Sequence, residues 1–161
     1  MTAMKNFVLK IELRGEGITR TVAIPADYGF FDLHEVIQIV FGWEDYYYHQ
    51  FDFGRTAIVD DANEEADLLP EKFRYEYEAN LEFFLMNFKN FTYTYDIEQP
   101  WVHEVEVEGI LEDGFDCPVL LECAGRMIRE EILDENETDV SLGDAPNKDF
   151  LNAYLKETFY N

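Results

Sequence analysis

Positive charge is scarce in this chain, which has 12 Lys and Arg against 35 Asp and Glu and a formal net charge of −23 at pH 7. A surface of this sign repels phosphate backbones and anionic lipid headgroups. Direct binding to DNA or RNA is therefore disfavoured, and so is binding to a membrane surface. The simplest use of the charge is solubility, and the partner we expect is a protein.

Cysteine is also scarce, because Cys117 and Cys123 are the only two in the chain. Neither belongs to a pair with metal-finger spacing. Two buried free thiols in a reducing compartment are the simplest interpretation, and a disulfide or a metal pair is the alternative.

Long apolar runs and targeting signals are missing as well. The start of the chain, MTAMKNFVLKIEL, has no basic segment followed by an apolar run, so it is not a signal peptide. No window approaches the roughly 20 apolar residues that cross a bilayer. These absences predict a cytoplasmic protein without a membrane segment.

The signatures of common catalytic sites are absent too. There is no Gly-rich phosphate loop, no GxSxG motif and no Cys and His pattern typical of a nucleophile. Glu130 and Glu131 are adjacent, and on a helix they would point about 100 degrees apart. We therefore assign no catalytic residue and expect no cofactor.

Apolar and aromatic side chains are abundant. The chain is 47% hydrophobic and contains 14 Phe, 10 Tyr and 2 Trp. Disorder requires charge together with poor hydrophobicity, so we expect a compact globule. A chain of this length fits one domain, residues 1–161, which buries about two thirds of its unfolded surface on folding.

The first two strands are predicted from strict alternation of side chains in residues 7–13 and 18–24. The apolar face of the first consists of Phe7, Leu9, Ile11 and Leu13. In the second, Arg20 falls on the otherwise apolar face. The RGEG segment between them predicts a hairpin, and Pro25 ends it.

A helical period begins at Phe31, where apolar residues recur on one stripe up to Phe41. Gly42 follows and is expected to end the helix in a left-handed conformation. Residues 46–54 then predict a strand, and the charge of residues 59–73 is typical of an acidic surface loop.

Alternation returns in residues 73–79, which place Phe73 on one face of a predicted strand and Glu76 on the wet face. Residues 81–88 are ambiguous between a short helix and an edge strand. Residues 91–96 and 101–110 then predict a hairpin with one aromatic face, which we expect to pack under the first helix, and one acidic face.

The last third gives a weaker pattern. Residues 118–133 predict a short strand and a helix, and residues 134–147 predict a loop. Residues 148–160 predict an amphipathic helix with Asn147 as its cap. The fold class we predict is α+β: a mainly antiparallel sheet of five to seven strands, packed against one long helix and a C-terminal helix.

Within residues 7–132 the chain contains the segments LKIEL, IPAD, LHEVIQIVFGWED, HQF, FTYTYD and WVHEVEVE. Together these segments resemble the family of plasmid Ri open-reading-frame-three-like proteins. The resemblance implies a mixed α and β domain, an association with mobile elements and a family of unknown function.

The resemblance has departures that limit what it implies. Asp96 and the following IEQP stand where the family has a Gly-bearing turn, and Leu120 and Met127 stand where many members have cysteines. A thioether and an alkyl chain cannot replace two thiolates at a metal. Some members carry a resolvase label, but the only serine here, Ser141, lies in an acidic segment without an arginine-rich site.

All three histidines of the chain, His34, His49 and His103, fall inside the family segments. With Asp45 and Asp96 they make a candidate polar or metal site, because imidazoles and carboxylates ligate divalent metals. The more conservative interpretation is a hydrogen-bonded seam between helix and sheet, since no two of them have local ligand spacing. For His103 we expect a partner such as Asp96 or Tyr95.

A set of aromatic residues is a candidate surface or core: Trp43, Tyr47, Tyr93, Tyr95 and Trp101. Base-stacking platforms work with a basic groove, and the flanking residues here are acidic, so packing is favoured. The function we predict is a non-catalytic interaction or accessory domain. The alternatives are a metal-dependent hydrolase built on the histidines and an acidic decoy of nucleic acid that binds a basic protein.

Overall fold

The computed structural model describes residues 4–60, 73–96, 100–134, 137–142 and 145–159, and for residues 128–142 only the course of the backbone. Most of the predicted acidic loop at 59–73 lies outside these residues. In the part of the chain that is described, no helix combines the length and the apolar character needed to span a membrane.

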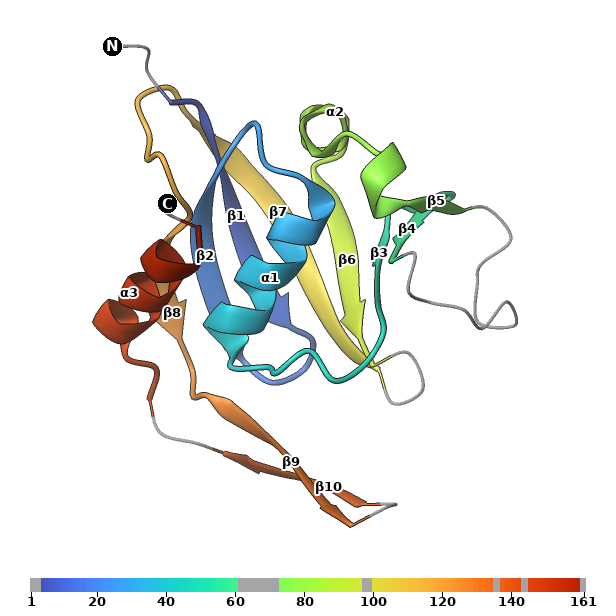
Figure 1. Cartoon of the computed structure of the whole chain (residues 1–161), viewed down its shortest axis with the longest axis vertical. Helices are drawn as coiled ribbons and strands as arrows, with labels where there is room; N and C mark the ends of the chain where they lie inside the picture. The colour runs from blue at the N-terminus through green and yellow to red at the C-terminus, as the bar shows by residue number, and fades with distance from the viewer. Residues whose placement is uncertain (1–3, 61–72, 97–99, 135–136, 143–144, 160–161) are drawn as a thin grey trace.

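An eight-stranded sheet forms the body of the fold, in the order β5-β4-β3-β6-β7-β1-β2-β8 (Figure 1). Its strands are β1 (Asn6–Leu13), β2 (Ile18–Pro25), β3 (His49–Asp52), β4 (Ala57–Val59), β5 (Phe73–Tyr75), β6 (Asn90–Tyr95), β7 (Trp101–Leu111) and β8 (Val119–Ala124). All neighbouring strands are antiparallel except β4 and β5. The predicted hairpins β1–β2 and β6–β7 are confirmed.

Three α-helices accompany the sheet: α1 (Phe30–Phe41), α2 (Leu81–Asn87) and α3 (Lys148–Phe159). Helix α1 lies across one face of the sheet, and α3 lies next to it against β8 (Figure 1). Gly42 ends α1 with φ 80° and ψ 22°, and the Asn147 side chain caps α3 at the Phe150 amide. The α+β class is confirmed. Among the described residues α1 and α3 have the same length of 12 residues, so the distinction between one long helix and a C-terminal helix is not confirmed.

Two predictions of secondary structure are wrong. The strand predicted at 73–79 stops at Tyr75, and Glu76–Glu78 form a 3-10 helix, η2, that turns the Glu76 side chain into the interior. The helix predicted after residue 124 and residues 137–142 of the predicted loop are instead a ribbon of β9 (Ile128–Asp134) and β10 (Glu137–Leu142), which extends away from the sheet (Figure 1). Backbone pairing with a neighbour overrides the local pattern there.

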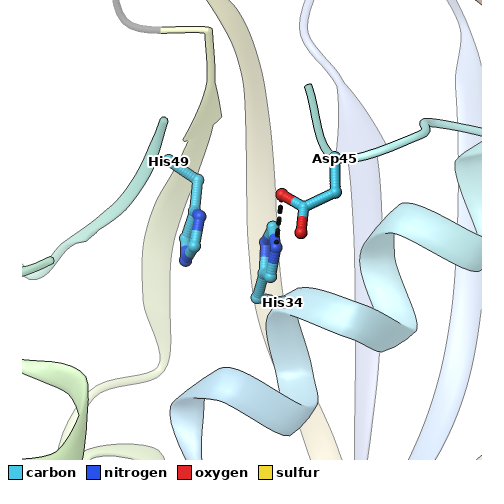
Figure 2. Close-up of side chains that lie close together, drawn as sticks. All are labelled: His34, Asp45 and His49. Carbon is cyan, nitrogen blue, oxygen red and sulfur yellow. Dashed lines mark hydrogen bonds and ion pairs between the residues drawn. The ribbon is translucent and has the colours of Figure 1, made fainter. Parts of the chain in front are cut away.

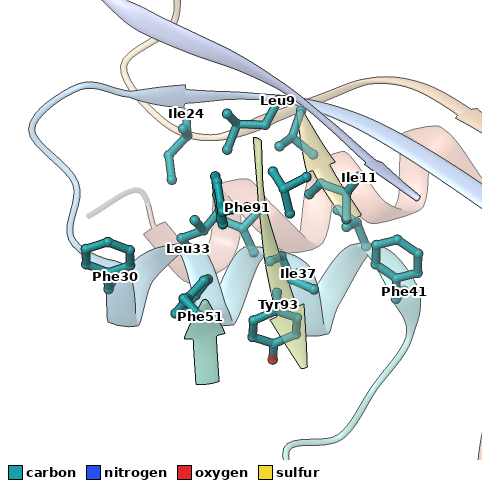
Figure 3. Close-up of a cluster of buried hydrophobic side chains, with 14 of the residues drawn as sticks. Leu9, Ile11, Ile24, Phe30, Leu33, Ile37, Phe41, Phe51, Phe91 and Tyr93 are labelled. Atoms are coloured by element: carbon teal, nitrogen blue, oxygen red, sulfur yellow. The ribbon is translucent and has the colours of Figure 1, made fainter. Parts of the chain in front are cut away.

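The core lies between the sheet and α1 (Figure 3). Leu33 and Ile37 of α1 point at the aromatic residues Phe51 of β3 and Phe91 of β6. The aromatic face of the β6–β7 hairpin therefore packs under α1, as the alternation predicts. Burial of such side chains stabilises the fold by about 1.5–3 kcal/mol each.

Arg20 of β2 occupies the apolar face and is fully buried. Its guanidinium donates to four carbonyl oxygens, those of Thr19 (2.8 Å), Val40 (2.8 Å), Ala124 (2.9 Å) and, at the longest distance, Arg126 (3.5 Å). It also lies over the Phe41 ring at 5.3 Å. Burial lowers the pKa of this side chain from its ordinary value. Arg20 thus ties the carboxyl end of α1 to two strands through neutral acceptors.

Candidate functional site

A cluster of polar side chains lies where α1, the loop after it and the start of β3 meet (Figure 2). His34 comes from α1, Asp45 from the loop and His49 from β3. One possible ligand atom of each lies within 4.8 Å of the others. Both rings are buried, whereas the Asp45 side chain is 54% exposed. The cluster therefore connects the interior with the surface.

His34 is part of a closed ring of hydrogen bonds. Gln38 Nε2 donates to Tyr93 Oη (2.9 Å), and His34 Nδ1 lies 2.7 Å from the same hydroxyl. His34 Nε2 lies 3.0 Å from Asp45 Oδ1, and the Asp45 backbone N–H donates to Gln38 Oε1 (2.7 Å). Asp45 adopts φ 56°, a left-handed conformation that this last bond stabilises.

The closed ring of hydrogen bonds determines which nitrogen of His34 carries the proton. Because Tyr93 accepts from Gln38, its own hydrogen goes to His34 Nδ1, and Nε2–H donates to Asp45. Burial, reinforced by the charge of His49, lowers the pKa of His34 to about 2. His34 is therefore neutral at physiological pH, and both of its nitrogens are satisfied.

His49 stacks on His34, with ring centroids 3.5 Å apart and an interplanar angle of 7°. Its Nε2 bonds to Oε1 of Glu76, which is buried in η2. Glu76 is the site residue that the sequence does not reveal, because alternation assigns it to the wet face. Only the turn from β5 into η2 brings its carboxylate inward.

The surface side of the cluster is acidic. Burial raises the pKa of Asp45, and the charges of Asp60 and Glu76 raise it further, against the opposing effect of His49. Burial also raises the pKa of Glu35, together with the charges of Asp32 and Asp45. Negative charge at this surface is thus partly desolvated and mutually repulsive.

His103 lies apart from the other two histidines and is not one of the close ligand group found among the described residues. Its Nδ1–H donates to the Tyr93 carbonyl (3.1 Å), and its Nε2 accepts from Trp43 Nε1 (3.2 Å). The expectation of Asp96 or Tyr95 as its partner is wrong. Burial lowers the pKa of His103 to about 4.

Asp96 is also outside the cluster. It ends β6 at φ 63°, and its backbone N–H donates to the Tyr48 carbonyl (2.9 Å). This pairing joins the end of β6 to the residue just before β3. Of the five residues predicted for the site, His34, Asp45 and His49 therefore converge and the other two do not.

The predicted aromatic set belongs to the core. Trp43, Tyr93 and Tyr95 are buried, and Tyr47 and Trp101 are partly buried against the same cluster. Trp43 lies 5.7 Å from Tyr95 and 5.4 Å from Trp101 between ring centroids. Their faces are used in packing, so they offer no platform for stacking bases.

The order Asp45, His34, Tyr93 has the form of a carboxylate, imidazole and hydroxyl relay. A relay of this form needs a hydroxyl that reaches its substrate. Tyr93 is 0% exposed, and burial raises its pKa well above the ordinary value. The hydroxyl points into the protein, so this arrangement holds α1 on the sheet and does not present a nucleophile.

The cluster also fits a metal ion poorly, although its donor atoms are close together. The rings are parallel at 3.5 Å, so an ion about 2.1 Å from a nitrogen of each would lie roughly 55° out of both ring planes. Imidazole lone pairs lie in the ring plane. Ligation would require both rings to tilt and His34 to break hydrogen bonds that it already makes.

This geometry predicts that Zn²⁺ does not stabilise the protein. A tenfold excess of zinc over protein should change the melting temperature by no more than about 1 °C relative to EDTA, because only ligands that bind the native state shift it. Differential scanning fluorimetry measures the change. A rise of several degrees that disappears in His49→Gln would restore the metal hypothesis.

A second feature lies on the opposite face of the sheet, where β3, β6, β7 and β1 form an open groove of about 690 Å³. Its ionisable side chains are Lys10, Glu12, Asp52, Glu104 and Glu106. Glu12 and Glu104 are direct cross-strand partners, and Lys10 is opposite Glu106. Arg14 donates to Glu104 from the rim (3.0 Å). We call this surface the acidic face.

Comparison with known proteins shows a similar solved structure and a matching family. The protein of unknown function MM3350 from Methanosarcina mazei Go1 has a crystal structure that is similar, with a TM-score of 0.62 and 29% sequence identity over 76% of this chain and 70% of that one. No curated protein matches the chain. The family model described as plasmid pRiA4b ORF-3-like protein matches residues 5–143. The chain therefore belongs to the plasmid pRiA4b ORF-3-like protein family.

Proposed function

We propose that this chain is a non-catalytic interaction domain, formed by residues 1–161 in the cytoplasm, that binds a basic segment of a partner protein on the acidic face. The observation that carries the proposal is the direct pairing of Glu12 with Glu104 in a groove with four carboxylates, one lysine and, on its rim, Arg14 paired with Glu104. Like charges directly opposite each other on neighbouring strands destabilise a sheet.

A bound cationic side chain relieves this repulsion. The groove is open, and its side chains at Glu12, Glu104 and Glu106 are exposed, so Lys or Arg side chains can reach the carboxylates. The net charge of −23 steers a basic partner toward the domain and repels nucleic acid. The histidine cluster on the other side then serves to hold α1, and no chemistry is required of it.

The test uses fluorescein-labelled oligolysine as the probe and fluorescence anisotropy as the measurement. The wild-type protein should bind, with an affinity that falls steeply as NaCl rises toward about 0.5 M. The triple variant Glu12→Gln, Glu104→Gln, Glu106→Gln should bind about tenfold more weakly. Exposed ion pairs contribute roughly 0.2–1 kcal/mol each, and about 1.4 kcal/mol corresponds to a factor of ten.

The matched control removes three carboxylates elsewhere, with Glu78→Gln, Asp113→Asn and Glu157→Gln, all of which are exposed. It has the same net charge as the first variant and should keep affinity within about twofold of wild type. Equal losses in both variants would show that only total charge matters and would overturn the proposal. Binding of a DNA duplex by the wild type would overturn it as well.

A further inference from the structure

One outer strand of the described sheet, β8, is a candidate for an interaction that the acidic face does not explain. β8 is the last strand on its side of the described sheet, next to β2. An edge strand presents unpaired backbone N–H and C=O groups and can pair with a strand of another molecule. Covering the edge with a helix or loop is one of the ways in which proteins prevent such pairing.

Asn152 of α3 covers this edge with its carboxamide. The Leu120 N–H donates to Asn152 Oδ1 (2.7 Å), and Asn152 Nδ2 donates to the Leu120 carbonyl (3.1 Å). One residue of β8 therefore exchanges two hydrogen bonds with one side chain. This is the pattern that a hydrogen-bonded pair makes in an antiparallel ladder, so Asn152 takes the place of one residue of a neighbouring strand.

Apolar contacts also hold helix α3 at this position, against β8 and α1. Leu151 and Leu155 are its buried side chains, and Phe159 packs on Tyr28 with ring centroids 5.6 Å apart. Its outer face keeps Phe150 and Tyr154 exposed. The helix also begins after residue 143, where the match to the family ends. The element that covers the edge therefore lies outside the part of the chain that the family model matches.

We propose that α3 guards the β8 edge against strand addition by a second copy of this chain. With Asn152 in place, Leu120 has no free backbone group to offer. Without it, two β8 edges can pair antiparallel about a twofold axis, because identical edges are complementary in this arrangement. The net charge of −23 makes two copies repel each other, so we expect the two β8 edges to pair only when salt screens this repulsion.

The test compares wild type with Asn152→Ala, a change that raises the helix propensity of α3 and so does not unfold it by itself. Hydrogen exchange of the Leu120 amide should become about tenfold faster, as expected for one lost hydrogen bond. Sedimentation equilibrium in about 0.5 M NaCl should show a monomeric wild type and a dimerising variant.

Tyr154→Ala is the control, since Tyr154 is exposed on the same helix, and it should stay monomeric with Leu120 exchange unchanged. Asn152→Leu supplies a second variant of similar volume without polar atoms and should dimerise like Asn152→Ala. If both Asn152 variants stay monomeric, the proposal is overturned, even if Leu120 exchanges faster. That outcome would reduce Asn152 to a local hydrogen-bond partner of β8.

Discussion

Replacing Arg20 by lysine is expected to lower the free energy of unfolding by about 3 kcal/mol. The planar guanidinium reaches carbonyls on α1, β2 and β8 at once, and a single ammonium group cannot span the same three acceptors. Each buried acceptor left without a donor costs about 1–3 kcal/mol. The loss is large against a total stability of about 5–15 kcal/mol.

Urea denaturation followed by tryptophan fluorescence measures this change. Arg14→Lys is the matched control, because Arg14 is exposed and bonds to one exposed carboxylate, and it should change stability by less than about 0.5 kcal/mol. If the free energy of unfolding of Arg20→Lys stays within about 1 kcal/mol of wild type, the several hydrogen bonds of the guanidinium do not hold α1 to the sheet.

Stability should fall as the pH drops below about 6.5, and the buried histidines are the reason. The folded pKa is about 2 for His34 and about 4 for His103, against an ordinary value of 6.5. Because both pKa values are lowered by folding, the unfolded chain binds more protons than the folded protein below about pH 6.5. The free energy of unfolding therefore decreases as the pH falls. Each histidine contributes a slope of about 1.4 kcal/mol per pH unit while only the unfolded form is protonated.

The raised pKa values of Asp45 and Glu35 act in the opposite direction, because the folded protein then binds protons more readily. They offset part of the loss at the acidic end of the range. The contribution of one histidine is therefore best isolated by comparing a variant with wild type at each pH.

His103→Asn provides this comparison, because its amide can still donate to the Tyr93 carbonyl but does not titrate. Urea denaturation at pH 4–7 and constant ionic strength should give a slope reduced by about 1.4 kcal/mol per pH unit between about pH 6 and 4. Arg14→Lys should keep the wild-type slope. Parallel curves for His103→Asn and wild type would show that His103 titrates normally in the folded protein.

Elements with a strong period could be predicted, and weaker ones could not. The alternation of side chains in β1, β2, β6 and β7 indicates strands, and the apolar stripe of α1 indicates a helix. The two hairpins and the helix could therefore be predicted from the local pattern. Residues 73–79 alternate equally well but leave the sheet at Tyr75. β9 and β10 depend on pairing with each other, which no local period reveals.

The candidate site was predictable only in part for the same reason. His34, His49 and Asp45 could be named from their residue types, but their convergence depends on where α1 crosses β3 and β6. Glu76 could not be named, because its inward turn is made by η2. The partner of His103 is two residues from the expected Tyr95, because the β6–β7 register places His103 opposite Tyr93, and its other nitrogen accepts from Trp43.

The sequence by itself determined the negative surface, the burial of the aromatic residues that alternate in β6 and the α+β class, because charge, hydrophobicity and period are properties of short segments. Tertiary structure decided which partners meet: the acceptors of Arg20, the pairing of Glu12 with Glu104 and the contact of Asn152 with Leu120. Apart from the bond of Arg20 to Thr19, these contacts join residues that lie 20 or more positions apart in the chain. They form only after the strands have taken their register, and register is set by packing across the whole sheet.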